Sequence, residues 1–181
     1  MLTRLLPLLL LTFLTACSTF DLKGDSQAPT DNWSISGKIG VTTPQESVAG
    51  FLSWEQTGRD FDIYVSGPFS VGSTRIEGNI EKISLTQNGE TVSGINPQHL
   101  IYKQLGWYFP IENLQFWLMG QAAPYSPAKT KTKDDQLSQI QQDQWRVDYL
   151  RYDAYYELPQ RIRISQGEWK FLIVVKNWSI N

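Results

Sequence analysis

From residue 33 to the end of the chain, short segments alternate apolar and polar side chains with a period of two. The first segment places Ile35, Ile39 and Val41 on one side and serine, lysine and threonine on the other. This period is typical of a strand with one buried and one solvated face. Similar segments lie at residues 48–56, 60–66, 74–77, 82–86, 90–92, 137–142, 145–152, 161–165 and 169–177.

Tight turns separate these segments. Asn88-Gly89 is among the strongest short-range hairpin signals, and Thr57-Gly58-Arg59, Gly78-Asn79 and Gly167 are further turn candidates. Strands joined by such short turns pair in the antiparallel direction, whereas parallel strands need crossovers of a dozen or more residues. A doubly wound α/β fold is therefore excluded.

A helix is predicted in the middle of the chain. Asn96 is a good N-cap, Pro97 suits the first helical position, and Gly106 closes a segment in which Ile101 and Leu105 share one face.

A second helix is predicted from residue 111 to 119, where Ile111, Leu114 and Leu118 have helical spacing and Gly120 is a stop signal. The stretch 122–133 contains two prolines and a Lys/Thr tract, so we expect an exposed loop there.

These elements predict a mainly β fold, an incomplete, half-closed antiparallel β-barrel with two short helices placed to cap its mouth. Because the 181 residues are 41% hydrophobic, one domain with a sizeable core is expected, over residues 33–181. The pattern alone leaves open whether the interior is hollow or filled with side chains.

The chain's single cysteine, Cys17, ends a segment with the features of an export signal. Arg4 precedes an apolar run at residues 5–14, which is shorter than the roughly 20 residues that span a bilayer. The stretch 14–17, Leu-Thr-Ala-Cys, matches a lipobox. We expect residues 1–16 to be removed as a signal peptide and Cys17 to carry diacylglycerol. The alternative is an ordinary signal peptide with a chance cysteine.

Residues 17–32 are expected to form a lipidated, flexible linker. This segment is polar, contains Gly24 and Pro29, and would span about 20 Å as a coil. Ser18 stands where an aspartate would favour inner-membrane retention in enteric-type bacteria, so the sequence is similar to an outer-membrane sorting signal. Two or more acyl chains would make such anchoring stable.

Several classes of function are poorly supported. A net charge of -2 provides no basic field for nucleic acid. His99 is the only histidine and Cys17 the only cysteine, so three-histidine zinc sites and cysteine clusters are excluded. His99 is expected on a helix surface. No spacing identifies two carboxylates as a general acid and a general base. We therefore expect no enzymatic activity, no bound metal and no cofactor.

One turn carries unusual apolar residues. In Gly67-Pro68-Phe69-Ser70-Val71-Gly72, a Phe and a Val stand between turn-forming residues, although turn tips are usually polar. Their side chains are either tucked under a neighbour or held out to contact a membrane or a partner.

The chain resembles the LolB family of outer-membrane lipoprotein receptors over nearly its whole mature length. The resemblance rests on the order and spacing of the lipobox, Trp33 with residues 37–41 (Gly-Lys-Ile-Gly-Val), residues 51–54 with Gln56, the Gly-Pro-Phe turn, 106–110, 117–120 (Trp-Leu-Met-Gly), 145–149 (Trp-Arg-Val-Asp-Tyr), Tyr152 and 158–161 (Leu-Pro-Gln-Arg).

This resemblance implies a barrel whose helices form a lid over an apolar cavity for acyl chains. It further implies an outer-membrane receptor, facing the periplasm, that accepts lipoproteins from the carrier LolA and inserts them into the inner leaflet of the outer membrane. Gly67, Pro68, Phe69 and Val71 would form the membrane-insertion loop, with Phe69 where many members carry Leu. A transfer receptor needs no symmetry, so a monomer is expected.

Strand parity and helix position suggest side chains that would line the cavity, namely Ile39, Phe51, Ile63, Val65, Leu105, Trp117 and Tyr149. The main competing hypothesis is a structural or envelope-sensing lipoprotein with a filled β core that binds a protein partner. A lipid-acting enzyme is a more distant third.

Overall fold

A computed structural model describes residues 32–67 and 72–180, which form one antiparallel sheet of eleven strands and two helices. The strands are β1 (Asn32–Thr42), β2 (Ser47–Thr57), β3 (Asp60–Ser66), β4 (Thr74–Gly78), β5 (Ile83–Gln87), β6 (Glu90–Gly94), β7 (Ala128–Lys133), β8 (Gln136–Gln142), β9 (Trp145–Tyr152), β10 (Pro159–Gln166) and β11 (Trp169–Ile180). The helices are α1 (Pro97–Leu105) and α2 (Ile111–Leu118).

The strand order is β6-β5-β4-β3-β2-β1-β11-β10-β9-β8-β7. Consecutive strands are therefore neighbours, except that the helices separate β6 from β7 and that β1 pairs with β11. Because β6 and β7 remain as the two edges, the barrel is not closed. The predicted fold class, mainly β with an incomplete antiparallel barrel and two short helices, is confirmed.

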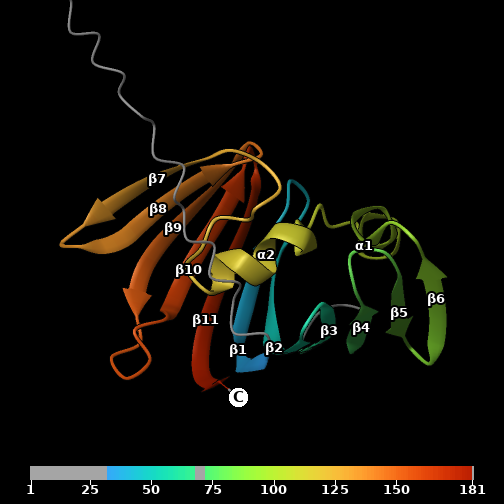
Figure 1. Cartoon of the computed structure of the whole chain (residues 1–181). Helices are drawn as coiled ribbons and strands as arrows, with labels where there is room; N and C mark the ends of the chain where they lie inside the picture. Colours follow the sequence, from blue (N-terminus) through green and yellow to red (C-terminus); the bar gives the residue numbers. More distant parts are fainter. Residues whose placement is uncertain (1–31, 68–71, 181) are drawn as a thin grey trace, which may run out of the picture.

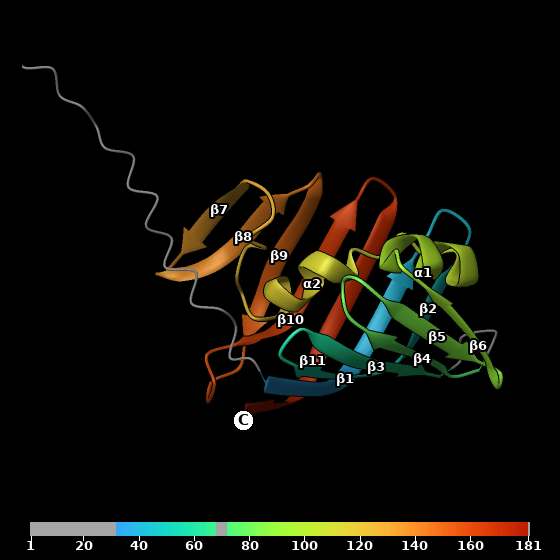
Figure 2. The same ribbon diagram turned by 45° about the vertical axis from the view of Figure 1, so that its right-hand side comes forward.

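Both helices lie on the same side of the curved sheet (Figures 1 and 2). We call this side the inner face and the opposite side the outer face. The alternation read from the sequence puts most of the large apolar side chains on the inner face, so that Trp33, Trp54 and Trp178 cluster at one end of the sheet. Trp145 and Phe171 pack together further along the sheet. Each such burial contributes about 1.5–3 kcal/mol.

The signals for α1 act as the sequence predicts. Asn96 Oδ1 accepts a hydrogen bond from the His99 backbone N–H at 2.9 Å, and Pro97 occupies the first turn. Gly106 has φ 70° and ends the helix with a backbone N–H that bonds Tyr102 O. His99 is exposed on the helix surface, as expected.

The expected loop at residues 122–133 is wrong in its second half, because residues 128–133 form strand β7. This strand alternates Lys and Thr and pairs with β8. It has no buried side chain, so period-two hydrophobicity could not reveal it. Exposed lysines on an edge strand also oppose pairing with other chains.

Candidate functional site

The inner face and the helices that cover it form the candidate site. Five of the seven residues expected to line a cavity are buried there, from three strands and α2: Ile39, Ile63, Val65, Trp117 and Tyr149. Leu105, at the end of α1, is half-buried and packs against the same cluster. The structure therefore brings six of the seven together.

Phe51 is the exception, and its expected inward orientation is wrong. Its side chain is 59% exposed, whereas Leu52 is 4% exposed. Strand β2 has apolar residues at two consecutive positions, so only one of them can face inward. Register places Phe51 opposite Lys38 of β1, on the outer face.

Gln142 is a central residue of the site that sequence reasoning missed. Its side chain is 2% exposed. Its Oε1 accepts hydrogen bonds from the Trp117 indole N–H and the Ala123 backbone N–H, both at 2.9 Å. Its Nε2 donates to Ala123 O at 2.6 Å and to Ser126 O at 2.8 Å. One side chain thus joins β8, α2 and the segment after it.

Further polar contacts hold α2 to the sheet. The Tyr149 hydroxyl of β9 donates to Trp117 O at 2.9 Å. Burial raises the pKa of this hydroxyl well above its usual value, which keeps the proton needed for donation. Asn113 Nδ2 and Ser126 Oγ both donate to Asp143 Oδ2 at 2.8 Å. Helix α2 is therefore fixed by buried hydrogen bonds as well as by packing.

Helix α1 is held differently. Leu100 and Ile101 are buried, and the helix lies against β5, β6 and α2. Within residues 32–67 and 72–180, no hydrogen bond or ion pair joins an α1 side chain to the sheet. Because its attachment is apolar, α1 can shift at lower cost than α2.

An open groove of about 430 Å³ borders α1. Its lining combines residues at the start of the helix and within it with two aromatic residues from later in the chain, namely Asn96, Gln98, His99, Tyr102, Tyr108 and Trp169. Tyr108 stacks on Trp145 with ring centroids 6.2 Å apart. The aromatic wall of this groove therefore continues into the buried inner face.

Trp33 Nε1 is the buried side-chain polar atom that has no hydrogen-bond partner among the described residues. The neighbouring indoles do have acceptors, since Trp54 bonds Gln56 and Trp178 bonds Pro159 O. An unpaired buried donor costs about 1–3 kcal/mol. The inner face thus includes a donor that a carbonyl group could satisfy.

Gly67 and Gly72 flank the apolar turn and are both exposed. Gly67 has φ 142°, and a Cβ at this position would lie 2.9 Å from Gly50 Cα of β2. Glycine is therefore required where the chain leaves β3. The other residues expected in this loop, Pro68, Phe69 and Val71, and the expected lipidation site Cys17, lie outside the described residues.

Comparison with known proteins identifies the family. The family model described as "Outer membrane lipoprotein LolB" matches residues 31–178. An outer-membrane lipoprotein LolB of Stutzerimonas stutzeri is 38% identical over 155 residues, which cover 83% of this chain and 75% of that protein. One from Pseudomonas fluorescens is 35% identical, covering 87% of this chain and 78% of its own length.

A solved structure supports the fold independently. The crystal structure of a LolA superfamily protein from Nitrosomonas europaea superposes with a TM-score of 0.58 at 8% sequence identity, covering 84% of this chain and 87% of that one. At that identity the likeness concerns the fold alone. The matches in sequence, by contrast, are above 30% over most of both chains, and the chain therefore belongs to the LolB family of outer-membrane lipoproteins.

Proposed function

We propose that the chain accepts lipoproteins from the periplasmic carrier LolA, shelters their acyl chains against its inner face, and inserts them into the outer membrane. Family membership makes it a receptor in lipoprotein localisation and not an enzyme. The observation that carries the finer proposal is the apolar inner face, covered by one helix held through buried hydrogen bonds and one held by packing alone.

The energetics of acyl chains require such a shelter. Each methylene exposed to water costs about 0.8 kcal/mol, so bare lipid tails cannot cross the aqueous periplasm. Without nucleotide energy, transfer needs a receiver that binds the chains more tightly than the carrier does, but less tightly than the bilayer. A helix that covers the inner face, moves away to admit the chains and then returns over them would provide this intermediate affinity.

The structure suggests which parts would move. Ile39, Ile63 and Val65 stand on the rigid sheet, and Trp117 belongs to the hydrogen-bonded helix. Leu105 lies at the end of α1, next to the left-handed Gly106. We therefore assign opening to α1, while α2 remains on the sheet and keeps Trp117 and Tyr149 in place.

Attachment and delivery complete the proposal. Lipidation at Cys17 would anchor the chain to the outer membrane with the folded domain facing the periplasm. Phe69, in the turn between Gly67 and Gly72, would enter the bilayer surface as the cargo leaves. Gly67 and Gly72 both have positive φ, and such flanking glycines suit a turn that presents an apolar side chain away from the sheet.

An acyl-probe titration tests the shelter. We expect a fluorescent fatty-acyl probe to bind stoichiometrically and to be displaced by a lipoprotein. Val65→Trp, which fills space on the inner face, should weaken binding severalfold, whereas Tyr64→Trp on the outer face of the same strand should not. Circular dichroism would confirm that both variants fold. Absence of probe uptake by the unmodified chain would favour the packed scaffold instead.

Removal of the anchor should leave the fold intact. Within residues 32–67 and 72–180, the hydrophobic core extends from Trp33 to Ile180, and we expect Cys17→Ala to leave these contacts unchanged. We expect this variant to be soluble and folded and to accept a lipoprotein from the carrier, measured by transfer of labelled cargo. A variant that fails to fold would show that the N-terminal segment is structural.

A further inference from the structure

The outer face of one half of the sheet, formed by β1, β11, β10, β9, β8 and β7, is basic. Strand register places its exposed basic residues in three parallel rows, and only Asp148 adds a carboxylate to them. We call this the basic face, and it consists of Lys38, Arg161 and Arg151 in the first row, Arg163 and Lys131 in the second, and Lys170, Arg146 and Lys129 in the third.

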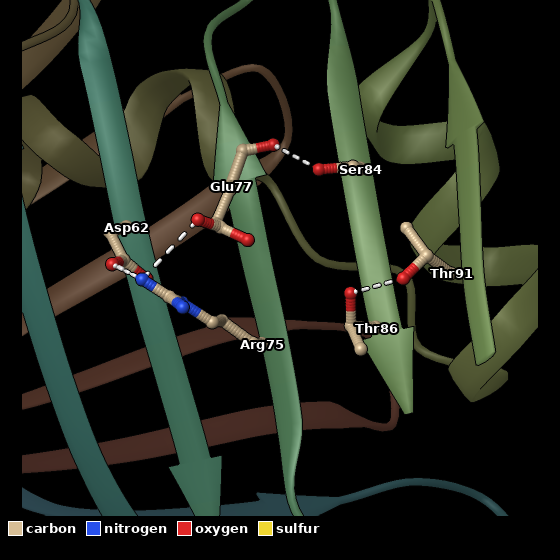
Figure 3. A network of polar contacts seen from close by, with 6 residues as sticks. All are labelled: Asp62, Arg75, Glu77, Ser84, Thr86 and Thr91. Carbon is tan, nitrogen blue, oxygen red and sulfur yellow. Dashed lines mark hydrogen bonds and ion pairs between the residues drawn. The ribbon is translucent and has the colours of Figure 1, made fainter. Parts of the chain in front are cut away.

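In the other half of the outer face, the arginine of β4 is paired with carboxylates. There Arg75 of β4 donates to Asp62 of β3 through Nε at 3.0 Å and also pairs with Glu77 at 3.3 Å (Figure 3). These carboxylates raise the pKa of the Arg75 guanidinium. On the basic face, by contrast, Arg146 is the residue with an ion pair among the described residues, to Asp148.

The first row contains an unfavourable contact. Arg151 of β9 lies directly opposite Arg161 of β10, where a β-bulge interrupts the ladder. Like charges placed opposite each other destabilise a sheet, and neither residue has a carboxylate partner among the described side chains. An anionic ligand close to both guanidinium groups would offset this repulsion.

Exposed apolar side chains lie beside these arginines. Leu150 in the bulge is 42% exposed, and the β9–β10 loop presents Tyr155 at 84% and Tyr156 at 40%. The two rings pack edge to face at 4.7 Å, and Asp153 Oδ1 accepts both backbone N–H groups, so the loop is ordered by its own contacts. Tyrosine and arginine together are typical of surfaces at a membrane–water interface.

This corner lies where the folded domain joins its N-terminal segment. The Trp178 indole near the end of β11 donates to Pro159 O at the base of the loop, and Trp33 at the start of β1 pairs with Ile180. Figure 1 shows the β9–β10 loop, the start of β1 and the C-terminal end together at the lower end of the sheet. Asn32 is the fifteenth residue after Cys17, which limits their distance to about 50 Å.

We propose that the basic face, together with Leu150, Tyr155 and Tyr156, docks the domain on an anionic phospholipid surface. The cations would lie among the headgroup phosphates and the tyrosines at the depth of the glycerol backbone. The acyl anchor already provides attachment, so this contact fixes orientation. It goes beyond the proposed function and does not depend on cargo binding.

Vesicle flotation tests the proposal with the mature chain carrying Cys17→Ala, so that the anchor does not dominate. We expect binding to vesicles of phosphatidylethanolamine and phosphatidylglycerol, weaker binding to phosphatidylcholine alone, and loss of binding in about 0.5 M salt. Arg151→Glu with Arg161→Glu should weaken binding about fivefold. This pair replaces one like-charge contact by another, so folding should be little affected.

Two further variants sharpen the test. Lys82→Glu with Lys103→Glu changes net charge equally at exposed positions outside the basic face and should leave binding unchanged. Tyr155→Ser with Tyr156→Ser should weaken binding while the charge is retained. Equal binding by the arginine variant and its lysine control would overturn the proposal. So would an arginine variant that binds vesicles normally but no longer receives cargo from the carrier, because the face would then dock a protein.

Discussion

Replacement of Gln142 by leucine is expected to lower the free energy of unfolding by about 4 kcal/mol, although the side chain changes little in size. Leucine would leave four buried or half-buried groups without their partner, namely the Trp117 indole N–H, the Ala123 N–H and the carbonyls of Ala123 and Ser126. Each unsatisfied buried group costs about 1–3 kcal/mol, and partial access of water reduces the sum.

Chemical denaturation followed by tryptophan fluorescence would measure this loss. Gln141→Leu is the matched control, because Gln141 is the neighbouring residue of the same strand but is exposed on the outer face. Its substitution should change stability by less than about 0.5 kcal/mol. A loss below about 1 kcal/mol in Gln142→Leu would show that packing alone holds α2, and the assignment of opening to α1 would lose its basis.

Much of the sheet could be predicted from local sequence. Period-two alternation located ten of the strands, because most of them have apolar side chains at alternate positions. Asn88 and Gly89 both have positive φ in the turn between β5 and β6, as their chemistry predicts. The turn between β7 and β8 uses Asp134 and Asp135 at positive φ without any glycine, and Ala128 is the single apolar residue of β7. The local sequence therefore contained no signal that predicted this turn or strand β7.

The candidate site was only partly predictable, for a different reason. Helical and strand periods identify buried positions such as Ile63 and Trp117, but they do not specify partners distant in the chain. Gln142 meets Trp117 across 25 positions, and nothing in its neighbourhood distinguishes it from the exposed Gln141. Phe51 was misplaced because parity is ambiguous wherever two apolar residues adjoin, and only the register with β1 decides it.

Phe69→Glu is expected to slow delivery of bound lipoprotein into a bilayer about thirtyfold while acyl-probe binding stays unchanged. Phe69 is proposed to enter the membrane surface, where a carboxylate would have to lose its hydration or the turn would have to stay outside. Gly67 and Gly72 are unaffected by this change, so β3 and β4 should keep their pairing. The measurement is transfer of labelled lipoprotein from the loaded receptor into liposomes.

Phe69→Leu is the matched control, because it keeps an apolar side chain of the kind many members of the family carry, and it should deliver at the normal rate. Ser70→Glu places the same charge one residue away and separates the effect of the side chain at the tip from that of net charge. If the Phe69→Glu variant delivered as fast as the unmodified chain, the turn would have no role in the membrane. Release would then have to follow from the opening of α1 alone.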